Sequence, residues 1–181
     1  MAFPLLGTAQ LGMPYGIANL TGKPDRETAF AILEAAVEEG ITAFDTAAAY
    51  GDSEAILGSF IEAHGLASSI GIVTKVKAHA PDEIDRAIDS SLRRLRVSKL
   101  SVLLLHSMPD RESLFDIVER LAERVDDGQV DSVGISVYET EDALDVLRTS
   151  RLSITQVPTN LFDHRFIEAG VFDAGIRERK R

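Results

Sequence analysis

Four chemically active side chains occur at regular intervals along the sequence, namely Asp45, Tyr50, Lys75 and His106. Lys75 follows Asp45 by 30 residues, and His106 follows Lys75 by 31. A tyrosine can donate a proton to a carbonyl oxygen, but its free pKa is about 10, so it needs a neighbouring cation to exchange protons at neutral pH. A buried lysine in turn needs a carboxylate. These residue types therefore predict proton transfer to a carbonyl group.

The spacing of these residues predicts how they come together. Each lies at the end of a short apolar segment or in the loop after one, and Ser136 extends the series 30 residues beyond His106. One βα unit of a parallel barrel has about this length, and the chemistry of such barrels lies at the C-terminal ends of the strands. We therefore expect residues far apart in sequence to meet at one rim.

Apolar periodicity predicts six strand–helix units. Strict alternation of short apolar strands with helices implies parallel strands joined by right-handed crossovers. The fold class is predicted to be α/β, a TIM-type (β/α) barrel that is incomplete, with about six βα units readable. The expected strands are 3–8, 41–45, 71–75, 100–105, 130–135 and 152–157. The expected helices are 25–39, 110–127, 141–148 and 163–179, with two more that begin near Asp52 and at Pro81.

Composition excludes several classes of protein. A net charge of −10 argues against a nucleic-acid partner, and no apolar run approaches the length that spans a membrane. The absence of cysteine excludes a disulfide framework and cysteine-ligated zinc, and no metal-ligand cluster is evident. No Gly-x-Gly-x-x-Gly pattern follows a strand, which disfavours a Rossmann cofactor site. With no basic signal region at the N-terminus, we expect a cytoplasmic protein.

Six segments together resemble the aldo-keto reductases, which are NADP(H)-dependent (β/α)8-barrel oxidoreductases, and they follow that family's order. The segments are 7–12 (GTAQLG), 44–54 (FDTAAAYGDSE), 74–75 (TK), 104–106 (LLH), 134–136 (GIS) and 156–160 (QVPTN). The resemblance implies that residues 1–181 form a single aldo-keto reductase-like domain that lacks the last two βα units. The charged ending, 175–181, supplies no strand.

The resemblance also implies a role for each catalytic residue. Tyr50 is similar to the family's proton donor to the substrate carbonyl. Lys75 would lower the pKa of Tyr50, and Asp45 would pair with Lys75. His106 would hydrogen-bond the carbonyl oxygen and orient the substrate, which would be an aldehyde, a ketone or a sugar.

The same resemblance implies an NADP(H) site. Ser136 and Gln156 would hold the nicotinamide carboxamide, with Thr46 and Asn160 nearby. Val137 stands where the family often has Asn, which removes one amide that could contact the nicotinamide. The family's stacking aromatic and its 2′-phosphate-binding residues lie in loops after strands seven and eight, which are not among these residues. We therefore expect NADP(H) to bind weakly.

Structural interpretations of single residues remain open. Asp45 and Ser136 could cap helices, His106 could be a satisfied core histidine, and Gln156 could fill the barrel. A second function hypothesis is a non-catalytic partial barrel that is stabilised by association with another chain. Unpaired strand edges invite such pairing, so we expect a homo-oligomer.

Overall fold

The structure is a computed structural model that describes residues 4–78 and 80–181. Six parallel strands form one curved sheet in the order β1-β2-β3-β4-β5-β6, with helices between them, and this confirms the predicted incomplete barrel. The strands are β1 (Leu6–Gly7), β2 (Ala43–Asp45), β3 (Gly71–Val76), β4 (Leu100–Leu105), β5 (Val130–Ser136) and β6 (Ile154–Gln156). The helices are α1 (Ala9–Gly12), α2 (Arg26–Glu38), α3 (Ser53–His64), α4 (Pro81–Leu95), α5 (Arg111–Asp126), α6 (Thr140–Arg148), α7 (Arg165–Glu168) and α8 (Val171–Arg177).

Most predicted elements are found within a few residues of their expected bounds. The predicted helix 163–179 is wrong, because the chain forms α7 and α8 with Gly170 between them in the left-handed region at φ 70°. The short α1 was not among the expected helices. The first expected strand begins at Phe3, which lies outside the described residues.

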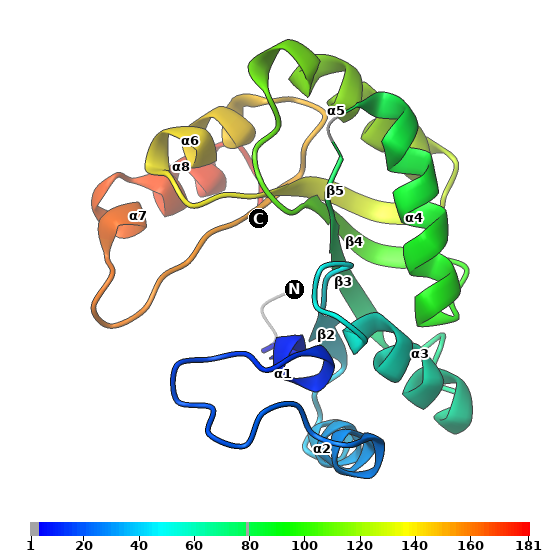
Figure 1. The fold of residues 1–181 in the computed structure, drawn as a ribbon. Coiled ribbons are helices and arrows are strands. Elements are labelled where there is room, and N and C mark those ends of the chain that lie inside the picture. Colours follow the sequence, from blue (N-terminus) through cyan, green and yellow to red (C-terminus); the bar gives the residue numbers. More distant parts are fainter. Residues whose placement is uncertain (1–3, 79) are drawn as a thin grey trace.

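Alternation along the strands separates the core from the site. Phe44, Ile72 and Leu103 belong to the hydrophobic core that the outer face of the sheet shares with the helices. Helices α2 to α6 follow the outside of the curved sheet in Figure 1. Because successive strand residues point to opposite faces, the neighbouring residues Asp45 and Lys75 point to the inner face.

A buried carboxylate fixes the start of α3. Glu54 is 1% exposed; its Oε1 accepts a hydrogen bond from the Thr74 hydroxyl at 2.6 Å, and its Oε2 accepts one from Arg94 Nε at 2.6 Å. These bonds join α3 to β3 and to the end of α4. Gly58 lets α3 and α4 touch, because a Cβ there would lie 2.2 Å from the Arg94 carbonyl oxygen. The loop between β2 and α3 is therefore anchored from the side of the core.

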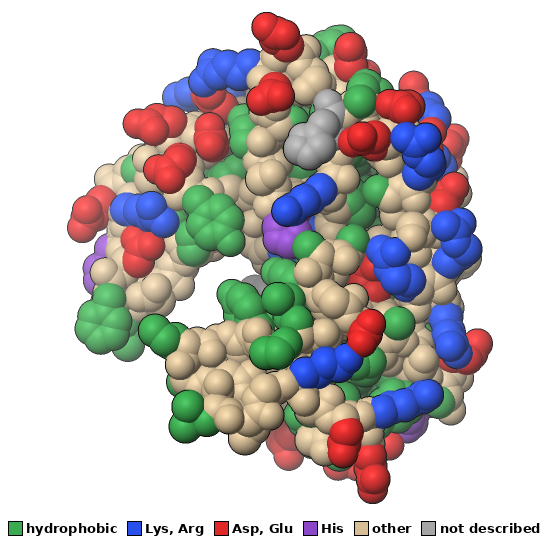
Figure 2. All heavy atoms as spheres, viewed as in Figure 1, with side chains coloured by type: hydrophobic (Ala, Val, Ile, Leu, Met, Phe, Trp, Pro, Cys, Tyr) green, Lys and Arg blue, Asp and Glu red, His purple; other side chains and the backbone are tan. Residues whose placement is uncertain are grey.

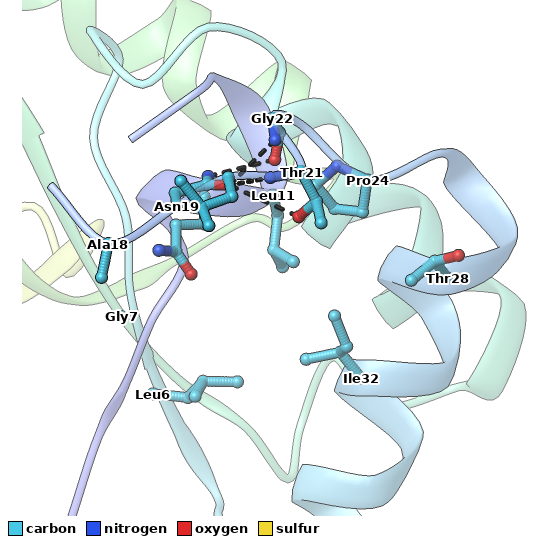
Figure 3. A pocket seen from close by; sticks show the side chains of 12 residues that line it. Leu6, Gly7, Leu11, Ala18, Asn19, Thr21, Gly22, Pro24, Thr28 and Ile32 are labelled. Atoms are coloured by element: carbon cyan, nitrogen blue, oxygen red, sulfur yellow. Dashed lines mark hydrogen bonds between the residues drawn. The ribbon is translucent and has the colours of Figure 1, made fainter. Parts of the chain in front are cut away.

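The sheet is open at both edges. β1 pairs only with β2, and β6 is followed by no further strand among the described residues. In the view of Figure 2 the molecule has an opening with hydrophobic side chains at its border. Beside β1 lies a groove of about 510 Å³, into which Leu6 and Ile32 point (Figure 3). At the other edge Arg181 lies along β6: its N–H donates to the Ser153 carbonyl at 3.1 Å, and its carbonyl accepts from the Thr155 N–H at 2.8 Å.

The Glu54 contacts predict a large effect on stability. Glu54→Gln should lower the free energy of unfolding by about 3 kcal/mol, because it leaves the Arg94 guanidinium without its buried counter-charge. The matched control is Arg86→Gln, which breaks an ion pair with Asp82 whose two side chains are each 74% exposed and should cost less than about 1 kcal/mol. Urea denaturation measures both. Equal losses in the two variants would contradict this account of the buried pair.

Candidate active site

An ion pair lies at the centre of the inner face. Lys75 Nζ is 2.5 Å from Asp45 Oδ1 and donates a second hydrogen bond to the Thr46 carbonyl at 3.1 Å. The other carboxylate oxygen of Asp45 accepts a hydrogen bond from Gln156 Nε2 at 2.9 Å. The Lys75 side chain is 3% exposed and that of Asp45 17%. Both charges are thus largely removed from water and paired with each other.

Tyr50 and His106 lie next to this pair. Their ring centroids are 5.6 Å apart at an interplanar angle of 87°, so one ring presents its edge to the face of the other. Lys75 Nζ lies 5.1 Å from the centroid of the Tyr50 ring. The four residues predicted from the sequence spacing therefore meet at one place. What each does in a reaction stays a prediction.

The expectation that Lys75 lowers the pKa of Tyr50 is wrong for this structure. Burial and the negative charge of Asp45, helped by the phenols of Tyr15 and Tyr138, raise the pKa of Tyr50 to about 12. The physical reason lies in the ion pair: the Lys75 ammonium is already bonded to Asp45, and it sits near the face of the tyrosine ring. At neutral pH Tyr50 is therefore a protonated phenol.

His106 is held as a neutral imidazole. Burial, and then the positive charges of Lys75 and Lys77, lower the pKa of His106 from its ordinary value of 6.5, while Asp45 opposes this. Its Nδ1 is buried and has no hydrogen-bond partner among the described residues. Buried polar atoms are rarely left unpaired, and such exceptions often mark functional sites. The other ring nitrogen, Nε2, is not among the buried atoms that lack a partner in the described part of the chain.

Glycines and hydroxyls of the recognised segments position the Tyr50 loop. A Cβ on Gly12 would lie 1.8 Å from the Tyr50 carbonyl oxygen, and one on Gly51, at φ +56°, would lie 2.3 Å from the Gly12 carbonyl oxygen. The buried Ser53 hydroxyl donates toward Thr8 Oγ1 at 2.7 Å or the Thr8 carbonyl at 2.9 Å, and it accepts from the Thr46 hydroxyl at 3.0 Å. These contacts tie the loop after β2 to the loop after β1.

The residues predicted to hold a cofactor divide into two groups. Ser136 and Gln156 are register partners on β5 and β6, and both line a cavity of about 200 Å³ with Tyr50, Lys75, His106 and Tyr138. The structure does not bring the side chains of Thr46 and Asn160 to this cavity. The Thr46 hydroxyl is bonded to Ser53, and Asn160 Oδ1 accepts from the Phe162 N–H at 2.8 Å in an exposed loop.

Two residues, Tyr15 and Tyr138, and one contact of Gln156 were not predicted from the sequence. Tyr15 lies 6.5 Å from Tyr50 between ring centroids, and its carbonyl accepts hydrogen bonds from the Gln10 and Asn19 side chains. Tyr138 borders the cavity from the loop after β5. Gln156 supports Asp45 as well as facing the cavity. Tyr138 lies two residues beyond Ser136, and Tyr15 lies in the loop after β1. Their positions in loops that follow strands are the feature of the sequence that could have identified them as site residues.

The fold is an open (β/α) barrel. Its tyrosine, lysine, aspartate and histidine lie together at or just after the C-terminal ends of the strands, where the active sites of such barrels lie. The family model described as "Aldo/keto reductase family" matches residues 5–175, so the chain belongs to this family. This confirms the resemblance drawn from the six segments. Among residues 4–78 and 80–181, no helix has the length and apolar character needed to cross a bilayer, and no group of three His, Cys, Asp or Glu side chains is arranged to hold a metal.

Individual relatives support this assignment. The aldo-keto reductase YhdN of Bacillus subtilis is 27% identical over 176 residues, which cover 91% of this chain and 52% of the relative. The NAD/NADP-dependent indole-3-acetaldehyde reductase of Schizosaccharomyces pombe is 30% identical over 147 residues, with 77% and 51% covered. The crystal structure of a Klebsiella pneumoniae aldo/keto reductase in complex with NADP and acetate superposes with a TM-score of 0.80 at 29% identity, covering 97% of this chain and 60% of that one. The chain thus spans about half the length of these curated relatives.

The surroundings of His106 predict its titration. We expect its pKa, measured by NMR from the ring Cε1–H resonance, to lie below 6.5, because burial and two nearby ammonium groups disfavour the imidazolium. The same resonance in urea-unfolded protein is the control and should titrate near about 6.5. A folded-state pKa above the unfolded one would mean that Asp45 dominates the field at the ring.

Proposed function

We propose that the chain carries the active site of an oxidoreductase that transfers a hydride between NADP(H) and the carbonyl or alcohol group of an aldehyde, ketone or sugar. The supporting observation is the assembly of a protonated Tyr50, a neutral His106 and the buried Lys75–Asp45 pair around one cavity. Membership of the aldo/keto reductase family and the NADP complex of the Klebsiella pneumoniae relative favour the same chemistry.

In reduction, Tyr50 acts as the general acid. Its pKa of about 12 keeps the phenol protonated, so the proton is available when negative charge develops on the carbonyl oxygen. Once Tyr50 has given up its proton, the Lys75 ammonium, 5.1 Å from the ring centroid, stabilises the phenolate until solvent reprotonates it. In oxidation the phenolate is the base, so this direction needs a higher pH.

His106 orients the carbonyl group. Since its Nδ1 is buried without a partner, Nε2 is the ring nitrogen that can reach the cavity, and a neutral imidazole protonated there can donate a hydrogen bond to the carbonyl oxygen. The ring is held edge-to-face against Tyr50, which places both donors beside one acceptor. A charged imidazolium would be repelled by the ammonium groups of Lys75 and Lys77, and this repulsion contributes to the lowered pKa of His106.

Ser136 and Gln156 fit the carboxamide of a nicotinamide. The Ser136 hydroxyl is both donor and acceptor, and Gln156 keeps Oε1 free while its Nε2 is bonded to Asp45. A bound nicotinamide cofactor would supply the hydride. The part proposed for Thr46 is indirect, because its carbonyl accepts from Lys75 while its hydroxyl stays in the buried network. Asn160 would assist from the loop after β6.

Replacement of the proton donor tests this proposal. Tyr50→Phe should lower kcat for NADPH-dependent aldehyde reduction by about 10²–10⁴-fold, the usual contribution of general acid catalysis, while the affinity for NADPH changes little. Tyr15→Phe removes a nearby hydroxyl but keeps the donor, so its effect should be far smaller. Full turnover in Tyr50→Phe would exclude it as the donor. A wild-type protein that binds NADPH yet reduces no aldehyde would refute the proposed reaction.

The open sheet edges support a second proposal, that the chain associates with a second copy. The backbone of β1 is unpaired on one side, and Leu161, Phe162 and Ile176 are exposed large apolar side chains from the opposite end of the sheet. We expect light scattering at micromolar concentration to give twice the chain mass of 19.7 kDa. A single-chain mass with a cooperative melt and no binding of a hydrophobic dye would show that the partial barrel is stable alone.

A further inference from the structure

Lys77 stands beside the proposed active site without any part in the proton transfer. β3 and β4 pair as far as Val76 opposite Leu105, and Lys77 and His106 are the residues that follow directly on each segment. The His106 N–H donates to the Val76 carbonyl at 2.9 Å, which continues the strand geometry to this point. The charge of Lys77 acts on the imidazole of His106.

Lys77 carries a positive charge that no described residue pairs with. Unlike Lys75, it is exposed, and it makes no hydrogen bond or ion pair with any residue that the structure describes. The carboxylate of the site, Asp45, is already bonded to Lys75 and Gln156. Lys75 and Asp45 largely cancel, whereas the charge of Lys77 acts on His106 without a described counter-charge of its own, in a chain whose net charge is −10.

We propose that the Lys77 ammonium binds a carboxylate of the substrate, so that the preferred substrates are aldehydes or ketones that also carry an acid group. This inference rests on the proposed function. A carbonyl oxygen between Tyr50 and His106 directs the rest of such a molecule out of the cavity, on the side where the charge of Lys77 acts on His106. The flexible stem of lysine lets its point charge follow the acid group. The same charge helps to keep His106 neutral.

The surroundings favour a carboxylate over a phosphate. A phosphate dianion is usually held by arginine forks or by the N–H groups of a helix N-terminus. The helix that follows Lys77 is α4, whose first turn carries Asp82 and Glu83, so that N-terminus repels a dianion. A single ammonium matches the single charge of a carboxylate.

Comparing two aldehydes of nearly equal shape, one charged and one neutral, separates the effect of the substrate's charge from that of its shape. We would compare 4-carboxybenzaldehyde with its neutral methyl ester, methyl 4-formylbenzoate, and report the ratio of their kcat/KM values at low salt. Lys77→Met should lower the acid-to-ester ratio about two- to fivefold, the size expected for one solvent-exposed ion pair, and Lys77→Arg should keep it. Salt at about 0.5 M should lower the wild-type ratio in the same way. Lys99→Met is the matched control: it removes a lysine that precedes β4, at the opposite end of the strands, and should leave the ratio unchanged.

A binding experiment makes the result independent of turnover. Both aldehydes are titrated into cofactor-free protein while the His106 ring resonance, assigned with His106→Gln, reports occupancy. The acid should bind the wild type about two- to fivefold more tightly than the ester, and this preference should vanish in Lys77→Met. An acid-to-ester preference that is equal in the wild type and Lys77→Met overturns the inference. If no aldehyde is reduced but the binding preference is present, the proposed reaction fails and the anion site stands.

Discussion

The buried Lys75–Asp45 ion pair is the interaction on which the inner face of this protein depends. An ammonium that is 3% exposed is unfavourable unless it is neutralised, and Asp45 supplies the counter-charge at 2.5 Å. The pair also acts on the two groups proposed to carry the chemistry, Tyr50 and His106. The negative charge of Asp45 adds to burial in raising the pKa of Tyr50, and the positive charge of Lys75 adds to burial in lowering that of His106. Burial is the larger cause of both shifts, and one member of the ion pair adds to it at each group, although Asp45 opposes the shift of His106.

Neutrality of Tyr50 and His106 suits a site that works as a donor of hydrogen bonds and protons. A phenolate or an imidazolium at these positions would add a charge to a partly buried cavity whose existing charges are already paired. The raised pKa of Tyr50 thus means that the uncharged resting state is the stable one. In this resting state Lys75 keeps its ion pair with Asp45, so no buried cation is left without a partner.

Much of the fold and the meeting of the four side chains could be predicted from the sequence, because both follow from local patterns. β4 has the bounds that its apolar run predicts, and α4 begins at Pro81, where proline is favourable. The break between α7 and α8 was missed because Gly170 interrupts a segment whose apolar residues look continuous. The pKa of Tyr50 was predicted in the wrong direction, since a sequence shows which charges are near but not which of them are already paired.

The contact between β2 and β6 could not be predicted from spacing. Gln156 follows Asp45 by 111 residues and lies four strands away in the sheet, yet its amide donates to Asp45 Oδ2 at 2.9 Å. Such a contact requires the sheet to curve until β6 approaches β2 across the inner face. The same carboxylate therefore receives Lys75 from β3 on one oxygen and Gln156 from β6 on the other. Both oxygens of a buried carboxylate need hydrogen-bond donors. Asp45 therefore depends on the curvature of the sheet, which brings Gln156 into reach. The same side chain contributes to the pKa shifts of Tyr50 and His106. The electrostatics of the site are in this way tied to the curvature of the open barrel.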